Sequence, residues 1–68
     1  MTRVIPTDIH DKDGNLLQIH FEDAVTGEFC LQSEWDSREE QTAENRKKFR
    51  EWSVLMAKRL GFDVFQGH

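Results

Sequence analysis

The first half of the chain alternates between apolar and polar side chains. An apolar or β-branched residue occupies every second position along residues 5–9, 17–21 and 29–31. A period of two with one apolar face is typical of half-buried antiparallel strands. We therefore predict strands at about residues 3–10, 15–22 and 28–32.

Turn residues separate these runs. Asp13-Gly14 lies between the first and second runs, and Thr26-Gly27 lies between the second and third. Glycine readily adopts the positive φ that tight hairpins require, so both gaps are interpreted as hairpin turns. Pro6 has no N–H to donate to a neighbouring strand, which favours an edge position for the first strand. If the turns centre on these dipeptides, the facing pairs are Ile9 with Leu17, Ile19 with Leu31, and Phe21 with Phe29.

The second half of the chain predicts one long helix over residues 37–60. Ser37-Arg38-Glu39-Glu40 fits a capping box, in which a hydroxyl side chain caps the helix and a glutamate follows three residues later. Gly61 ends the helix, and Phe62 is placed for the apolar contact of a Schellman stop. The first half of this helix is polar on every side. Either it projects past the sheet, or the helix begins later than the cap suggests.

These elements together predict an α+β fold for a single domain spanning residues 1–68. A three-stranded antiparallel β-meander packs against one C-terminal α-helix, and a short apolar tail over residues 61–68 follows. A chain of this size has one small core. We expect the core to contain Ile5, Ile9, Leu17, Ile19, Phe21, Phe29, Leu31, Phe49, Trp52, Met56 and Leu60, with Phe62 and Phe65 closing its edge.

Two apolar residues of the predicted helix fall outside its apolar stripe. The stripe contains Phe49, Trp52 and Leu60. Val54 and Leu55 lie about 140° and 240° from Phe49 around the helix, at ~100° per residue. Either the tail folds back over one of them or a second molecule covers them. We favour a partner, because one short tail cannot cover two flanks.

Charge is distributed unevenly along the chain. The net charge is −4, with eleven acidic and three basic residues in 1–45 and six basic residues and one acidic residue in 46–60. Cys30 is the only cysteine, so an internal disulfide is impossible and a reducing compartment is expected. No apolar stretch approaches the ~20 residues of a membrane span, and the first residues do not read as a signal peptide. We therefore expect a cytoplasmic protein without a membrane partner.

Candidate chemical sites are weak in this sequence. The predicted register places His20 opposite Cys30 on the outer face of the sheet, within reach of one shared metal ion. A solvated polar face explains the same residues, so no metal site is expected. A hairpin turn also explains, without calcium, the four residues at EF-hand ligand spacing, because the glycine is misplaced and the flanks read as strands. These four are Asp11, Asp13, Asn15 and Glu22.

A three-stranded sheet with one helix leaves little room for a catalytic cleft. Nucleophilic catalysis needs a base and an orienting group held around the nucleophile in such a cleft. We therefore expect neither an enzyme nor a bound cofactor.

Basic residues in the second half of the helix indicate an alternative function, nucleic-acid binding. They spread around the exposed surface of the helix instead of forming one ridge, and the chain is acidic overall, which disfavours phosphate contacts. The residues concerned are Arg46, Lys47, Lys48, Arg50 and Lys58, with Arg59 beside them.

The function that we expect is that of a small non-catalytic protein-interaction module, acting as an adaptor or inhibitor of a larger protein. Its partner is another protein or a second copy of itself. A compact acidic chain of this kind also suits a phage or mobile-element product. The predicted partner-binding residues are Trp35, Val54, Leu55 and Arg59, because aromatic and arginine side chains dominate interface energetics.

Overall fold

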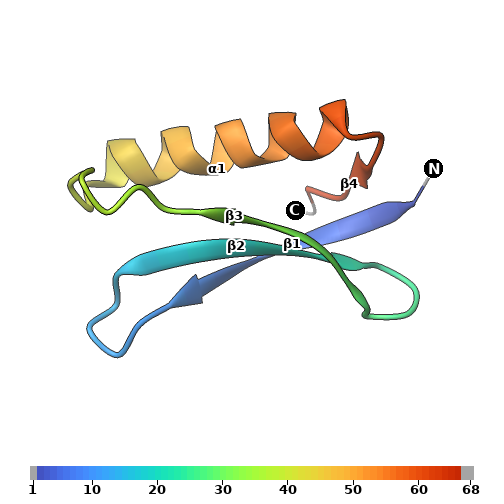
Figure 1. Cartoon of the computed structure of the whole chain (residues 1–68), viewed down its shortest axis with the longest axis horizontal. Coiled ribbons are helices and arrows are strands. Elements are labelled where there is room, and N and C mark those ends of the chain that lie inside the picture. The colour runs from blue at the N-terminus through green and yellow to red at the C-terminus, as the bar shows by residue number, and fades with distance from the viewer. Residues whose placement is uncertain (1, 67–68) are drawn as a thin grey trace.

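The protein has an α+β fold in which a single helix crosses one face of a small mixed sheet (Figure 1). The structure is a computed structural model and describes residues 2–66. Its elements are β1 (Arg3–His10), β2 (Leu16–Asp23), β3 (Phe29–Glu34), α1 (Ala43–Arg59) and β4 (Asp63–Val64). The sheet order is β3-β2-β1-β4, with the first three strands antiparallel and β4 parallel to β1. The predicted meander and C-terminal helix are confirmed, and β4 is an additional strand.

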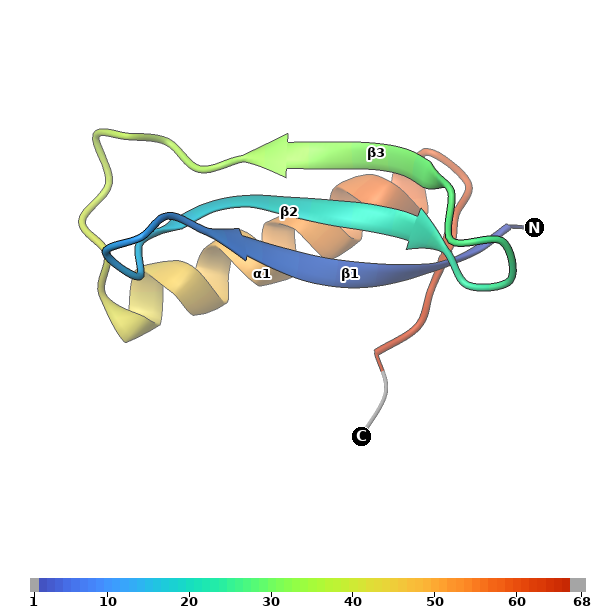
Figure 2. The same cartoon turned by 90° about the horizontal axis from the view of Figure 1, so that it is seen from below.

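The helix crosses the sheet obliquely. Seen from below, α1 starts on the β1 side of the sheet and ends near β3 (Figure 2). Within residues 2–66, no helix or strand covers the other face of the sheet. The molecule therefore has two layers and one open sheet face.

The face of β1 that lies against the helix is the opposite of the one that the sequence predicts. Its register pairs Pro6 with Phe21 and Asp8 with Ile19, so the predicted pairing of Ile9 with Leu17 is wrong. Val4 is fully buried, whereas Ile5 is 41% exposed. Both parities of this strand carry apolar residues, so alternation alone does not select a face. Packing against β4 and the end of α1 selects the face that contains Val4.

The first hairpin contains a register irregularity that changes which of two neighbouring leucines is buried. The irregularity between Ile9 and His10 leaves Leu17 43% exposed and Leu16 fully buried. The side chain of Gln41 holds the Leu16 backbone on both sides, accepting from its N–H at 3.0 Å and donating to its carbonyl oxygen at 2.9 Å. The predicted core position of Leu17 is therefore wrong, and its neighbour takes it.

A similar irregularity shifts the second hairpin. Phe21 pairs with Leu31 and Ile19 pairs with Ser33, so the register predicted for this hairpin is also wrong. The shift places Phe29 on the open face, where its ring meets the edge of His20 at a centroid distance of 5.4 Å. One extra residue in a strand reverses the side on which preceding residues lie, and sequence alternation does not reveal it.

The helix begins later than the predicted cap. Thr42 is the N-cap, and its hydroxyl oxygen accepts the N–H of Asn45 at 3.1 Å. The predicted start at Ser37 is wrong, because this segment forms a separate turn in which the Glu39 N–H donates to the carbonyl oxygen of Asp36. The predicted alternative, a later start, is the one that the structure shows.

The C-terminal end of α1 is as predicted. Gly61 has φ +96°, and its N–H donates to the carbonyl oxygen of Lys58 at 3.0 Å. The N–H of Phe62 donates to the carbonyl oxygen of Ala57 at 3.1 Å, which completes a Schellman motif. Phe62 then packs against the core. This stop reverses the chain and directs β4 alongside the start of β1.

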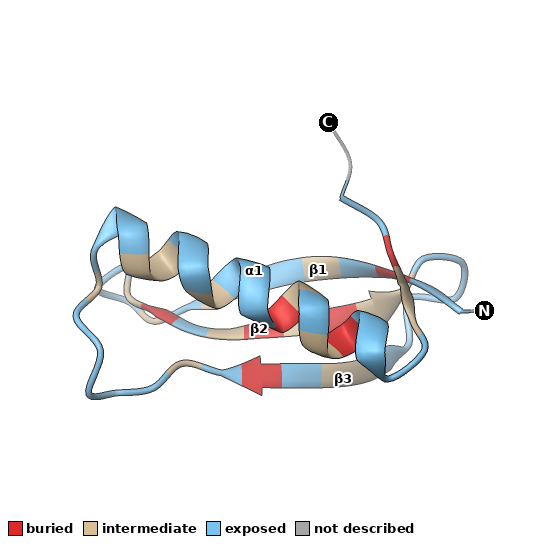
Figure 3. Ribbon diagram, turned by 90° about the horizontal axis from the view of Figure 1, so that it is seen from above, coloured by how far each residue is buried: buried red, intermediate tan, exposed pale blue. Residues whose placement is uncertain are grey.

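The helix is rotated about its axis relative to the prediction. Its buried residues are Ser53 and Ala57, so the buried side lies about 75° from the predicted stripe at ~100° per residue. Figure 3 shows the buried positions of α1 in its second half, with intermediate and exposed positions along the rest of the helix. Trp52 is 54% exposed and Leu60 is 64% exposed, so both core predictions are wrong.

The true core is small. Ile19 and Phe21 are buried as predicted, and Leu31 and Phe49 are partly buried against them. Phe65 is exposed and Met56 is only half-buried. The buried apolar residues are Val4, Leu16, Ile19, Phe21, Ala57 and Val64. Small side chains at the contact between helix and sheet allow close approach, which leaves the bulkier helix residues outside.

Candidate protein-binding surface

Three aromatic side chains cluster on the β3 side of α1. Trp35 follows β3, and its ring meets Phe49 edge to face with a centroid distance of 5.2 Å. Phe49 in turn stacks on Trp52 at 6.4 Å with an interplanar angle of 24°. The indole N–H of Trp35 donates to the carbonyl oxygen of Glu39 at 3.2 Å, which fixes this ring at the end of the sheet. Aromatic pairs in these geometries stabilise a protein by about 0.5–1.5 kcal/mol beyond the contribution of the apolar area that they bury.

A groove of about 480 Å³ opens beside this cluster, between the first half of α1 and the segment that follows β3. Its lining combines three aromatic rings with three acidic side chains and one lysine. A hydrogen bond and ion pair with the Arg38 guanidinium at 3.0 Å hold the pKa of Asp36 below its usual value. The lining residues are Glu34, Trp35, Asp36, Glu39, Asn45, Lys48, Phe49 and Trp52.

Further apolar side chains extend this surface along α1. Leu55 is 54% exposed, and Leu60 is also exposed near the end of the helix. We call the five residues Trp35, Phe49, Trp52, Leu55 and Leu60 the aromatic flank. Exposed apolar residues gathered in this way mark interaction sites more often than singly scattered ones do.

The structure brings together three of the four residues that the sequence indicated for partner binding. Trp35 and Leu55 belong to the aromatic flank, and Arg59 is exposed in the last turn of the same helix. Val54 lies elsewhere, because it packs against the core and lines a different groove. Trp52 and Leu60, which are exposed, and Phe49, which is partly buried, were predicted as core residues because their helical spacing indicated a buried stripe.

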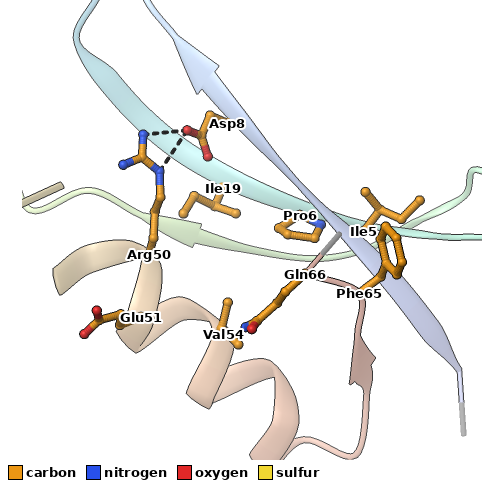
Figure 4. Close-up of a pocket in the computed structure, with 9 residues that line it drawn as sticks. All are labelled: Ile5, Pro6, Asp8, Ile19, Arg50, Glu51, Val54, Phe65 and Gln66. Atoms are coloured by element: carbon orange, nitrogen blue, oxygen red, sulfur yellow. Dashed lines mark hydrogen bonds and ion pairs between the residues drawn. The ribbon is translucent and has the colours of Figure 1, made fainter. Parts of the chain in front are cut away.

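A second groove, of about 610 Å³, lies on the opposite side of the helix (Figure 4). Arg50 closes one end of it, donating from Nε and Nη2 to Oδ2 of Asp8 at 3.0 and 2.7 Å. Figure 4 shows Phe65 beside Ile5 at the other end. The lining residues are Ile5, Pro6, Asp8, Ile19, Arg50, Glu51, Val54, Phe65 and Gln66.

The second groove borders the uncovered part of β1. β4 pairs with β1 only at Arg3 and Val4, and the N–H of Phe65 donates to the carbonyl oxygen of Val4 at 2.9 Å. Pro6 comes next on this edge and has no N–H to continue the ladder. The predicted edge position of the first strand therefore holds from Pro6 onward, and β4 covers only its start.

The basic residues of α1 are partly engaged with other side chains. Arg50 pairs with Asp8, Lys48 lies 3.4 Å from Glu44, and the Nε of Arg46 donates to Gln41 at 3.1 Å. Arg50 and Lys48 consequently point to different sides of the helix. The remaining basic residues, which are exposed, are Lys47, Lys58 and Arg59.

The predicted proximity of His20 and Cys30 is wrong. His20 pairs across the sheet with Gln32, and its Nε2 lies 2.8 Å from Oε1 of Gln18. The Cys30 thiol donates to the carbonyl oxygen of Glu28 and packs against the core. Within residues 2–66, no group of three or more histidine, cysteine, aspartate or glutamate side chains is arranged to hold a metal ion.

The segment with EF-hand-like spacing forms a hairpin turn. The Oδ1 of Asp11 accepts the backbone N–H groups of Asp13 and Asn15, each at 2.9 Å, and Gly14 adopts φ +83°. Its other carboxylate oxygen accepts the side-chain amide of Asn15 at 3.1 Å. These hydrogen bonds, led by that from the Asn15 N–H, lower the pKa of Asp11. The carboxylate therefore stabilises the turn between β1 and β2.

The chain matches no protein-family model, and neither the curated proteins nor the solved structures contain a significant match to it. Within the described residues, α1 is neither long nor apolar enough to cross a membrane.

Proposed function

We propose that this chain is a small non-catalytic protein-interaction module that binds its partner through the aromatic flank. One observation carries the proposal: α1 packs on the sheet through Ser53 and Ala57, which leaves Trp52, Leu55 and Leu60 in solvent. In a chain with so small a core, these are among the largest apolar side chains available, yet they do not contribute to it.

The energetics of burial support this surface. Full burial of one such side chain stabilises by roughly 1.5–3 kcal/mol relative to leaving it exposed. Tryptophan and arginine are also enriched among the residues that dominate binding energy. Trp52 and Arg59 lie two turns apart on α1 and are both exposed, so one partner surface can contact both. An adaptor or inhibitor of a larger protein would use such a surface.

Capture from an extract of the source cell tests the proposal. The wild-type chain is immobilised beside two variants, Trp52→Ser and Val25→Ser, and bound proteins are identified by mass spectrometry. Val25 is a matched control, because it is 91% exposed and lies in the turn between β2 and β3, away from the aromatic flank. We expect the wild type and Val25→Ser to retain the same protein and Trp52→Ser to lose it. Equal capture by all three chains would contradict the proposal.

The alternative function, nucleic-acid binding through α1, has less support. Asp8 and Glu44 engage Arg50 and Lys48, and the exposed cations Lys47 and Arg59 lie on different sides of the helix. A gel-shift series with DNA and RNA at low ionic strength distinguishes the two functions. Binding that weakens steeply with salt, and that is lost in the double variant Lys47→Glu, Lys48→Glu, would favour the alternative.

We further propose a cytoplasmic location and a phage or mobile-element origin for this protein. The free thiol of Cys30, which packs against the core, supports the reducing compartment. Redox-state labelling of this thiol in the source cell tests the location, since an oxidised thiol would contradict it.

A further inference from the structure

We propose that the partner that covers the aromatic flank is a second copy of this chain. In this two-fold dimer, the β3 strands pair antiparallel and the α1 helices pack side by side on one face of the joined sheet. The inference rests on the proposed function and names the occupant of its binding surface. Its support comes from the free edge of the sheet, the direction of the flank and the distribution of charge.

The strand β3 has a free edge. It is an outermost strand of the sheet in the described part of the chain. The Trp35 N–H donates to the carbonyl oxygen of Leu17 at 2.9 Å, so odd-numbered residues at this end direct their backbone groups to β2. Gln32 and Glu34 therefore direct theirs outward, since successive residues of a strand face opposite neighbours. Neither a proline nor a lysine protects this edge against strand addition.

The aromatic flank faces the side of the sheet that has this free edge. Arg50 reaches Asp8 on β1, so the side of α1 that bears Arg50 faces away from β3. Phe49 contacts Trp35 at the end of β3, so the side that bears Phe49 faces towards it. Trp52 and Leu60 lie within about 60° of Phe49 around the helix at ~100° per residue. A strand added to β3 would bring its own helix against these side chains.

One symmetry axis satisfies both contacts. The hydroxyl oxygens of Ser33 and Ser53 are 2.7 Å apart, which places the middle of the apolar side of α1 level with the second half of β3. A two-fold axis through β3 near Gln32 therefore also passes close to the middle of the flank, between Trp52 and Leu60. In a two-fold interface each patch contacts its own copy, so strand pairing and helix packing form together.

The distribution of charge along each copy supports an antiparallel arrangement of the two helices. The aromatic groove is lined by three acidic residues, Glu34, Asp36 and Glu39, of which Asp36 pairs with Arg38, and by one basic residue, Lys48. Lys58 and Arg59 form the last turn of α1. A two-fold axis reverses the second copy, so the basic last turn of each helix lies on the side of the axis that also holds the aromatic groove of the other copy. Opposite charges on facing patches favour association and fix register.

Molar mass measured by light scattering over a dilution series tests the dimer. We expect the wild-type chain to approach twice its monomer mass of 8.0 kDa as its concentration rises. Trp52→Glu should remain at one chain mass, because it buries a charge at the centre of the interface. The matched control Val25→Glu should follow the wild type. A wild-type mass of one chain at every concentration overturns the inference.

Cysteine cross-linking tests the geometry. In a Cys30→Ser background, Gln32→Cys should form a disulfide between two copies on mild oxidation, since an axis near Gln32 brings its two copies together. Gln18→Cys is the matched control, because Gln18 and Gln32 donate to the same Glu34 carboxylate oxygen but Gln18 lies on the inner strand β2. Equal cross-linking of the two variants overturns the strand pairing.

These experiments separate the inference from the proposed function. A monomeric wild type that still retains a cellular protein through Trp52 overturns only the second-copy partner. A monomeric wild type whose captured proteins do not depend on Trp52 overturns both.

Discussion

Ser33 and Ser53 lie at the centre of the contact between β3 and α1, with their hydroxyl oxygens 2.7 Å apart and both residues buried. A hydrophobic pattern assigns serine to the solvent, so it cannot predict this contact. Small side chains let the helix backbone approach the sheet, and the hydrogen bond satisfies both hydroxyls there. The helix consequently turns its small residues inward and Trp52 outward.

Removing one of these serines should destabilise the protein more than removing both. We expect Ser53→Ala or Ser33→Ala to cost about 1–3 kcal/mol in the free energy of unfolding, because the remaining hydroxyl is buried without its partner. The double variant should lose less stability than either single variant and lie close to the wild type, because no hydroxyl is then left without its partner. Urea unfolding of the four chains gives the coupling energy. Simple additivity would show that the two hydroxyls do not depend on each other.

Asp11 makes stability depend on acid. Its pKa is lowered in the folded chain, chiefly by the Asn15 N–H, so the folded state binds this proton less readily than the unfolded state. Its stabilising effect is therefore complete above the ordinary carboxyl pKa of about 4 and is lost as the pH falls through the lower folded value. Asp23 and Asp36 act in the same direction.

We expect Asp11→Asn to reduce the loss of stability below about pH 4. An amide keeps an oxygen acceptor for the turn but does not titrate. Lys12→Gln changes the charge of the same turn without removing the carboxylate, and it should keep the wild-type slope. Urea unfolding at a series of pH values measures the slopes. A wild-type slope in Asp11→Asn would contradict this role.

Among the elements, the strands were easier to predict than the faces they present. The boundaries of β1 and β2 follow from alternation and turn glycines, and the stop at Gly61 follows from its Schellman pattern. The facing of β1 could not be predicted, because Val4 and Ile5 are both apolar and only tertiary packing distinguishes them. Two shifts of register then displaced Leu17 and Phe29 from their predicted positions.

The start of α1 gives a prediction at the same scale. Thr42→Ala should lower the free energy of unfolding by about 1 kcal/mol, because it removes the acceptor for the Asn45 N–H. Ser37→Ala should change it by less than about 0.5 kcal/mol, because Ser37 is exposed and lies outside the helix. Thermal or urea unfolding compares the two variants. A larger loss in Ser37→Ala would support the capping box instead.

For the whole molecule, the sequence predicted the fold class and a surface on the helix, but it reversed the role of the bulky stripe. Phe49, Trp52 and Leu60 have the spacing of a core-facing side, and periodicity cannot distinguish a side that packs within the chain from one that packs against another chain. In the structure, Phe49 of this stripe is half-buried and Trp52 is exposed, and we propose that the exposed part packs against another chain. The central claim of this account is that the aromatic flank is open in one copy and covered in a complex.

Fluorescence of Trp52 at increasing protein concentration tests this claim most directly. The chain has two tryptophans, so Trp35→Phe leaves Trp52 as the sole reporter. We expect Trp52 to emit at long wavelength and to be readily quenched by acrylamide in dilute solution. Its emission should shift to shorter wavelength, and its quenching should fall, as the concentration rises. If Trp52 is sheltered from acrylamide at every dilution, the orientation of α1 is contradicted. If Trp52 stays exposed at every concentration, the proposal that a second copy covers it is contradicted.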